Sequence, residues 1–340
     1  MQTVLVSMLL SVIIPIYNVA AYLAACLRSV ETAVAELVKV RSEVWVEVIC
    51  VNDGSTDESG QILSKYMWHG PVICKNIRQD NMGVSAARNA GLAVATGEWV
   101  AFLDGDDTWA EDVLVQVFDR IHQTPLLDAV GIRMTKVDVH GRPLEDIGLD
   151  APDWVVSGDA ALRQAGGAYG SFLWLALDKF YRRDTIEKLA LRFPLNMPVG
   201  EDVLFNQCFL AQCGQVILCP SIVGYQYFIR QLSASTKQYE ELVHQPFRRF
   251  FALEEIWRRT GGTGVFRRLQ KDAAEIVMAG KEHIYAPTVR SKVIEQWLAS
   301  SEFLRVVRFM LIHGTAKSRC FSVAYLSGPR RMRRKLLAML

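Results

Sequence analysis

The 340-residue sequence predicts an α/β protein in which a mostly parallel sheet is flanked by helices and followed by a C-terminal helical region. Short apolar runs alternate with apolar residues at helical spacing up to about residue 125. After residue 240 the sequence becomes helical and basic. With 51% apolar and 22% charged residues, the chain has the composition of a folded globular protein.

Each element of the first half follows from its local pattern. Short apolar runs predict strands at 9–16, 44–51, 72–77 and 99–103. Apolar residues at helical spacing predict helices at 19–40, 60–66 and 84–95. Further along, the patterns predict a strand at 129–139, loop-rich sequence at 141–159 and a helix at 203–210. Strands and helices in alternation indicate right-handed crossovers, with helices on both faces of the sheet.

The opening run MQTVLVSMLLSVIIPIYN is expected to form a buried strand, because it lacks a basic start and a cleavage site and is shorter than about 20 apolar residues. The seven cysteines form no CxxC pair, so neither a disulfide framework nor a structural zinc site is predicted. Reduced thiols indicate a cytoplasmic protein.

A candidate site residue follows each predicted strand of the first half. These residues are Asn18, Asp53, Gly83 and Asp104. Because ligands of parallel α/β sheets bind at the carboxyl ends of the strands, these four positions are expected to converge on one crevice. Asp104, Asp106 and Asp107 repel one another, and a bound cation would compensate their charge.

The chain contains, in this order, the motifs SVIIPIYN, VNDGSTDES, QDNMGVSAARNAGL, GEWVAFLDGDD and GEDVLFN. These five ordered motifs resemble those of the inverting glycosyltransferases of family 2, which have the GT-A fold. The resemblance runs from about residue 9 to 236. It implies a catalytic domain over residues 1–240, with a donor half at about 9–125 and an acceptor half at about 126–240. Residues 241–340 lie outside the resemblance and are expected to form a separate, mainly helical region.

The resemblance implies transfer of a hexosyl or N-acetylhexosaminyl group, with inversion, from a nucleotide-diphosphate donor. It favours a UDP-sugar, and a glycan or lipid-linked acceptor at the cytoplasmic face of the membrane, in bacterial polysaccharide or cell-surface glycan synthesis. Two alternatives stay open. One is a non-catalytic partner in a glycan-assembly complex. The other is a nucleotidyltransferase of similar fold, although the glycine- and lysine-rich phosphate loop usual in those enzymes is missing after the first strand.

The acidic segment Asp104-Gly105-Asp106 corresponds to the family's Asp-X-Asp motif, which binds the donor. The resemblance implies that Asp106 touches Mn²⁺ or Mg²⁺ and that Asp104 touches the sugar or ribose and contributes to the metal site. Carboxylate oxygens suit both cations. The alternative is that Asp106 or Asp107 caps a helix beginning near Trp109.

The remaining donor contacts come from separate segments. The resemblance implies that Asp53 accepts a hydrogen bond from uracil, although it could also be a turn residue. It gives Arg88 either a phosphate or the acidic cluster as its partner, and an ion pair that only stabilises the crevice is the alternative. The other implied donor-binding residues are Pro15, Tyr17, Asn18, Gly83, Arg230 and Ser233, the last two from a loop that could also be ordinary surface.

The family's Glu-Asp pair corresponds to Glu201 and Asp202. Inverting transfer needs a base that takes the proton of the acceptor hydroxyl, and the resemblance assigns this role to Asp202 first and Glu201 second. Helix capping is the alternative, because Gly-Glu-Asp before an apolar run is a common helix start.

Positive charge is concentrated at the C-terminal end. Residues 241–340 hold 19 Lys and Arg against 8 Asp and Glu. The segments 303–311 and 330–340 place basic residues beside apolar ones, which suits an anionic membrane surface. Solvated helices that pack back on the protein are the alternative, and no motif for nucleic acid accompanies the charge.

Overall fold

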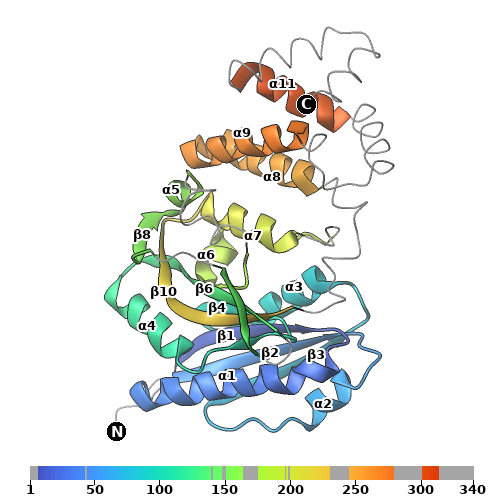
Figure 1. The fold of residues 1–340 in the computed structure, drawn as a ribbon, viewed down its shortest axis with the longest axis vertical. Helices are drawn as coiled ribbons and strands as arrows, with labels where there is room; N and C mark the ends of the chain where they lie inside the picture. Colours follow the sequence, from blue (N-terminus) through green and yellow to red (C-terminus); the bar gives the residue numbers. More distant parts are fainter. Residues whose placement is uncertain are drawn as a thin grey trace. The chain divides into compact units, whose positions relative to one another are not determined.

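A computed structural model of the chain describes residues 7–42, 44–138, 141–147, 151–163, 175–195, 197, 200–229, 245–278 and 301–313. The chain divides into two compact units, Met1–Gln231 and Leu232–Leu340. The units are described separately below. Figure 1 gives the elements and their labels.

The first four strands of unit 1 form a parallel layer in the order β3-β2-β1-β4. They are β1 (Ser7–Ile16), β2 (Val44–Asp53), β3 (Val72–Gln79) and β4 (Trp99–Phe102). β1 and β4 lie in the interior of the sheet, which explains why apolar residues in these strands do not alternate with polar ones. The carboxyl ends of these strands lie at one edge of the layer, as the sequence predicts.

Helices cover both faces of this layer. The helices are α1 (Ala20–Val40), α2 (Ser59–Lys65), α3 (Val84–Val94) and α4 (Val113–Gln123). Figure 1 shows α1 and α2 along one face and α3 across the other. α3 packs on β1 and β2, so that residues at its start lie beside the carboxyl ends of the strands.

The second half of the sheet is mixed. Its strands are β5 (Thr108–Trp109), β6 (Leu127–Val137), β7 (Pro143–Ile147), β8 (Trp154–Ser157), β9 (Lys179–Arg182) and β10 (Gln215–Phe228). β9 runs antiparallel between β4 and β6, while β6 and β10 are parallel. The predicted α/β class is confirmed, with parallel order confined to β3-β2-β1-β4 and the β6–β10 pair in the described residues.

Two expectations for this half are corrected. Residues 141–159 are not simply loop, because β7 pairs with β6 and β8 pairs with β10. Such short edge strands are ordered by a partner's backbone and carry little pattern of their own. The helix expected near Trp109 begins at Val113, and Trp109 instead lies in β5, paired with Tyr225 of β10.

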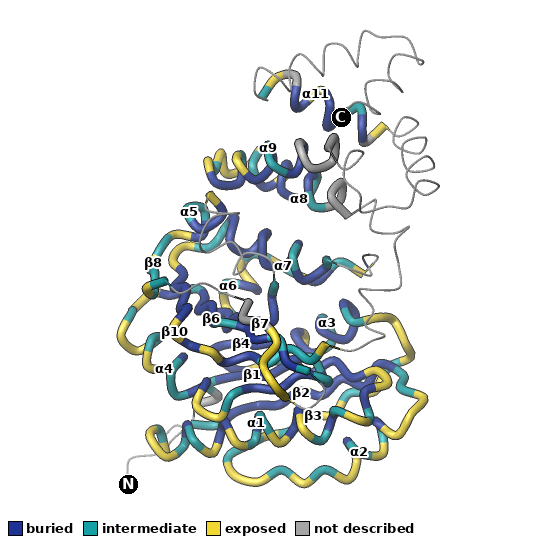
Figure 2. The backbone as a smooth tube through the Cα atoms, in the orientation of Figure 1, coloured by how far each residue is buried: buried dark blue, intermediate teal, exposed yellow. Residues whose placement is uncertain are grey.

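An aromatic cluster joins the two halves of unit 1. It is formed by Phe102, Tyr181, Phe193, Phe205 and Phe209. The rings of Phe193 and Phe205 stack at 4.2 Å. Through Phe205 and Phe209 the cluster fixes α7 (Glu201–Leu210). α5 (Gly158–Arg163) packs against α7 and β8, and α6 (Arg183–Lys188) packs against β9. Figure 2 shows the buried strands of this core in dark blue.

Unit 2 contains the described helices α8 (Gln245–Thr260), α9 (Thr263–Met278) and α11 (Ser301–His313). Its buried Asp272 pairs with Arg268 at 2.5 Å and with Arg249 at 2.9 Å. Part of the basic charge is therefore neutralised inside the unit. The apolar side of α11 is also buried, through Phe303, Val306, Val307, Phe309 and Met310.

Within the described ranges, every helix is too short or too polar to cross a lipid bilayer. The six cysteines that the structure describes are free thiols.

Candidate active site

The acidic loop follows β4 at the edge of the sheet where the parallel strands end. Carboxylate oxygens of Asp104, Asp106 and Asp107 lie within 4.8 Å of one another. Asp104 and Asp106 are half-buried, and Asp107 is buried. The N–H of Leu103, at the start of the loop, donates to the carbonyl of Ile13, so the loop is hydrogen-bonded to β1 where it leaves β4.

Asp107 is held from β10. The hydroxyl of Tyr225 donates to its Oδ2 at 2.6 Å, and the backbone N–H of Phe228 donates to its Oδ1 at 2.9 Å. Burial, followed by the charge of Asp104, raises the pKa of Asp107 to about 8. Because α4 begins at Val113 without a side-chain cap, the capping alternative for Asp106 and Asp107 is not what the structure shows.

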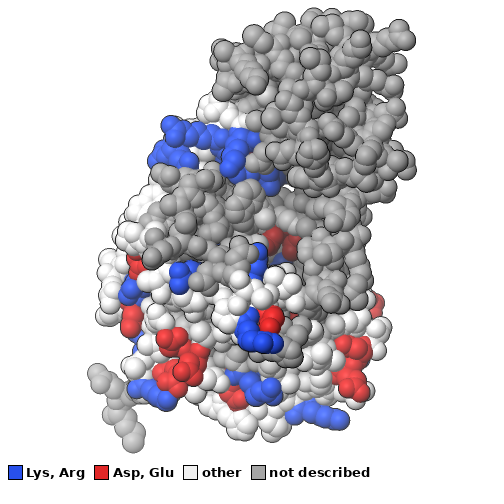
Figure 3. All heavy atoms as spheres, in the orientation of Figure 1, with Lys and Arg blue, Asp and Glu red and all other residues white. Residues whose placement is uncertain are grey.

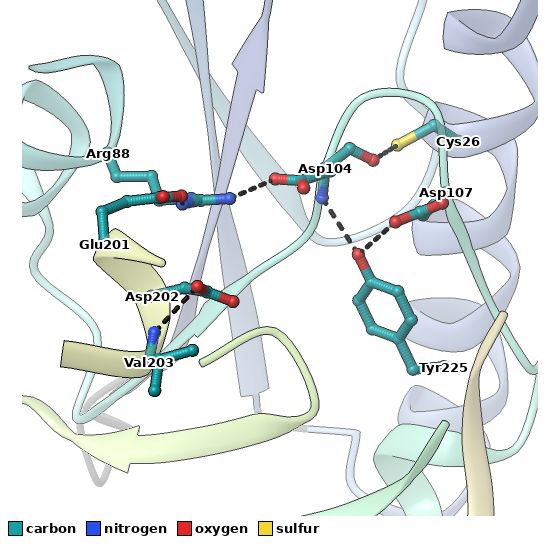
Figure 4. A network of polar contacts seen from close by, with 8 residues as sticks. All are labelled: Cys26, Arg88, Asp104, Asp107, Glu201, Asp202, Val203 and Tyr225. Atoms are coloured by element: carbon teal, nitrogen blue, oxygen red, sulfur yellow. Dashed lines mark hydrogen bonds and ion pairs between the residues drawn. The ribbon is translucent and has the colours of Figure 1, made fainter. Parts of the chain in front are cut away.

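Arg88 joins the acidic loop to α7. Its Nη2 donates to Asp104 Oδ1 at 2.8 Å, and its Nη1 donates to Glu201 Oε1 at 2.7 Å (Figure 4). Arg88 is 2% exposed, and its guanidinium lies over the ring of Phe193 at 5.2 Å. Of the partners open in the sequence, Arg88 takes the acidic cluster.

Asp202 lies at the start of α7, one residue after Glu201. Gly200 precedes both residues with φ of 80°, a left-handed backbone that favours glycine, and the chain enters the helix there. The Oδ1 of Asp202 accepts a hydrogen bond of 2.8 Å from the N–H of Val203. Burial, then the charge of Glu201, raises the pKa of Asp202 to about 7, against the lowering effect of Arg88.

A divalent cation fits the acidic loop. Hard oxygen ligands suit Mg²⁺ and Mn²⁺, which bind through one or two carboxylates and keep several waters. Asp107 already uses both oxygens to accept hydrogen bonds from β10, so Asp104 and Asp106 are the better pair of ligands. Arg88 occupies Oδ1 of Asp104, and Oδ2 remains for a ligand.

Asp53 lies at the carboxyl end of β2 and fixes the segment that leads into α3. Its carboxylate accepts hydrogen bonds from Gln79 Nε2 at 2.7 Å and from the N–H groups of Met82 at 2.9 Å and Gly83 at 2.8 Å. Gly83 has φ of 87°, which this turn into the helix requires. Asp53 and Gly83, both expected at the donor site, are thus in direct contact.

The residues expected around the nucleotide base lie at the end of β1. Asn18 Oδ1 accepts from the N–H of Thr56 at 2.8 Å, which ties the loop after β2 to β1. Tyr17 is 46% exposed. A side chain at Gly105 would approach the carbonyl oxygen of Pro15 to 3.1 Å, so the acidic loop packs closely on β1.

Arg230 and Ser233, and the basic segment 330–340, lie outside the described residues. Sequence reasoning missed the part that Tyr225 and Phe193 play in the site. A polar aromatic residue in a β-strand pattern and a phenylalanine before a proline carry no signal for the partners they contact here.

β2 and β4 end at one edge of the sheet, in Asp53 and in the acidic loop, and Arg88 joins that loop to the carboxylate pair at the start of α7. This arrangement is of the GT-A type. Residues 11–145 match the model of Glycosyl transferase family 2. The chain therefore carries a family 2 glycosyltransferase domain, as the motifs indicate.

Curated relatives agree with this assignment, and solved structures share the fold. The chain is 32% identical over 199 residues to the uncharacterized glycosyltransferase EpsJ of Bacillus subtilis, an alignment that covers 58% of this chain and 55% of EpsJ. The chain thus spans little more than half the length of that relative. Residues 1–349 of S. aureus TarS, solved in complex with UDP, match with a TM-score of 0.66 at 19% identity, over 97% of this chain and 88% of that one. Mannosyltransferase PcManGT from Pyrobaculum calidifontis, in complex with GDP-Man and Mn²⁺, matches with a TM-score of 0.52 at 15% identity, over 98% and 85%.

Proposed function

We propose that the protein is an inverting glycosyltransferase that moves a hexosyl or N-acetylhexosaminyl group from a nucleotide-diphosphate sugar to a glycan or lipid-linked acceptor. The observation that carries this proposal is the buried Asp202 carboxylate, with a pKa of about 7, joined through Glu201 and Arg88 to the Asp104 loop. A base is most effective when its pKa lies near the working pH.

Asp202 is the general base in this mechanism. The acceptor oxygen forms a bond to the anomeric carbon as the bond from that carbon to the phosphate oxygen breaks, and the hydroxyl proton passes to the Asp202 carboxylate. Water is kept from the base by burial, since Asp202 is 9% exposed. Asp104 and Asp106 would hold a divalent cation, which supplies positive charge against the diphosphate.

UDP is the proposed nucleotide. TarS has been solved with UDP and with UDP-GlcNAc, and PcManGT with GDP-Man and Mn²⁺. These neighbours support a nucleotide-sugar donor, and TarS, the better match, supports uridine. Asp53 at the end of β2 and the exposed Tyr17 at the end of β1 lie where open α/β sheets bind a nucleoside. Arg230 and Ser233 remain proposed diphosphate contacts.

Release of nucleotide diphosphate from a panel of nucleotide sugars tests this function. The assay contains Mn²⁺ or Mg²⁺ and acceptor-bearing membranes, and compares the wild type with Asp202→Asn and Asp106→Ala. Metal-dependent release from one donor, lost in both variants, is expected. If no donor is turned over and no nucleotide binds, the non-catalytic alternative replaces this proposal.

A peripheral contact of unit 2 with an anionic membrane is a second proposal. Figure 3 shows Lys and Arg side chains gathered over α8 and α9. The exposed ones include Arg258, Arg259 and Arg267, and α11 adds Arg305 and Arg308. Because the apolar side of α11 is buried, charge and not insertion of α11 would hold this surface. Co-sedimentation with anionic but not neutral vesicles, weakened by salt, is the expected result.

A further inference from the structure

The Glu-Asp pair at the start of α7 contains two carboxylates whose surroundings differ. Glu201 Oε1 accepts a hydrogen bond of 2.7 Å from Arg88, and Glu201 is 7% exposed. The hydrogen bond that the structure gives Asp202 comes from the adjacent N–H of Val203. Glu201 is thus bound to the buried guanidinium of Arg88, whereas Asp202 is bound by a backbone N–H, as Figure 4 shows.

The guanidinium of Arg88 is held by two ion pairs. Its two terminal nitrogens donate to carboxylates from different parts of the chain, Asp104 after β4 and Glu201 in α7. The guanidinium also lies over the ring of Phe193, a member of the aromatic cluster. A planar guanidinium can span two carboxylates in this way, whereas the ammonium of a lysine is a point charge.

We propose that Arg88 and Glu201 are positioning residues that lock the start of α7 to the acidic loop, so that Asp202 alone takes the proton of the acceptor. The inference rests on the proposed glycosyl transfer and deepens it. It divides the work within the Glu-Asp pair: Glu201 anchors the helix through Arg88, and Asp202 faces the reacting sugar. Movement of the acidic loop and movement of the base become coupled through one guanidinium.

Arg88 and Glu201 also shift the pKa of Asp202 through their charges. Glu201 raises the pKa of Asp202 and Arg88 lowers it. The other titratable groups that face Asp202 are Asp104 of the acidic loop, Lys179 and Tyr181 of β9, and Tyr227 of β10. Removing Glu201's charge and removing Arg88's charge should therefore move the pKa of Asp202 in opposite directions, which a merely structural role would not produce.

The test compares Glu201→Gln, Arg88→Met, the double variant and Arg88→Lys. The glutamine side chain keeps an oxygen that can accept the hydrogen bond from Arg88. The acid limb of kcat/KM against pH is expected to move down by about one pH unit in Glu201→Gln and up by about one in Arg88→Met. The double variant should fall between the two. Arg88→Lys keeps the charge and stays nearest to the wild-type pH profile, but loses kcat because it cannot hold both carboxylates.

Glu187→Gln is the matched control, because Glu187 forms an exposed ion pair with Arg192 at 3.0 Å. It should leave the acid limb in place. Shifts in the same direction in Glu201→Gln and Arg88→Met, or no shift in either, would overturn the proposal. If Arg88→Met does not fold, Glu201→Gln and Arg88→Lys still decide, since a limb that stays at its wild-type position in Glu201→Gln is sufficient to reject it.

A second readout does not depend on turnover. Asp202→Asn is added to the wild type, to Glu201→Gln and to Arg88→Met, and the change in the free energy of unfolding is measured against pH. This change reports the pKa of Asp202 in each background. If no nucleotide sugar is turned over, the measurement still shows whether Arg88 and Glu201 act on Asp202 in opposite directions. Failure of the proposed function and failure of the positioning pair are therefore distinguishable.

Discussion

Tyr225 and Asp107, 118 positions apart in the sequence, share a hydrogen bond of 2.6 Å that ties the end of β10 to the acidic loop. The N–H of Asp104 in turn donates to the Tyr225 hydroxyl at 3.4 Å. One phenol therefore contacts two of the three aspartates of the loop. The loop's shape depends on the mixed half of the sheet as well as on β4, which delivers it.

Tyr225→Phe should loosen the loop. The substitution removes the hydroxyl and leaves Oδ2 of buried Asp107 without this donor, at an expected cost of about 1–3 kcal/mol in the free energy of unfolding. Urea unfolding measures that cost, and a Mn²⁺ titration should show weaker binding. Tyr227→Phe, two residues further along β10 and half-buried, is the control. Equal losses in both variants would remove the special role of Tyr225.

Asp106→Ala should abolish stabilisation by metal. A cation that binds only the folded protein adds about 2.7 kcal/mol to its stability at a hundredfold excess over the dissociation constant. Unfolding of the wild type should therefore shift with Mn²⁺, and unfolding of Asp106→Ala should not. Asp184→Ala, at an exposed carboxylate of α6, should respond like the wild type. An undiminished shift in Asp106→Ala would place the cation elsewhere.

If Asp202 is the general base, donor turnover should fall as the pH is lowered. The pKa of this carboxyl is raised to about 7, so the fraction able to accept a proton drops about tenfold for each pH unit below that value. Donor turnover measured from pH 5 to 9 should rise to a plateau above pH 7. A rate that is flat from pH 5 to 7 would contradict a base with this pKa.

The parts of the site that could be predicted from the sequence are those that depend on residues close together in the chain. β1, β2 and β4 are mostly apolar runs, and Asp53 and Asp104 come at or directly after the ends of β2 and β4, so the edge where they meet can be inferred from strand order. Whether Arg88 binds phosphate or a carboxylate could not be predicted, because its partner Glu201 lies 113 positions away in the sequence. β7 and β8 were missed for the same reason: their order comes from β6 and β10 and not from their own residues.

Gly91→Ala should strain the contact between α3 and β1. A Cβ at this position would lie 2.4 Å from Cγ2 of Ile13, a side chain with no exposed surface. Overpacking of this kind costs about 1–3 kcal/mol, more than the roughly 1 kcal/mol that alanine gains over glycine in a helix. Thermal unfolding should show the loss. Gly60→Ala in α2 is the matched control, because its Cβ would meet only the amide nitrogen of Asn52, at 3.1 Å, and its stability should hold or rise.

Asp202→Asn should make the protein more stable while it removes activity. A buried carboxyl with a raised pKa binds its proton more tightly in the folded state, so wild-type stability falls as pH rises from about 4, the unfolded pKa, to about 7. Asparagine has no such proton. The gain of the variant over the wild type should therefore grow across this window and level off above pH 7, at on the order of 1 kcal/mol for each unit of pKa shift.

Urea unfolding of both proteins at pH 4, 5.5, 7 and 8.5 measures this gain. Asp184→Asn, at an exposed carboxylate, should show no such growth with pH. A variant that is less stable than the wild type at pH 8.5 would mean that the Asp202 carboxylate holds α7 in place, as a helix cap does. A variant that is more stable there and inactive would mean that the folded protein keeps a buried charge at a cost in stability, which is expected of a base and not of a cap.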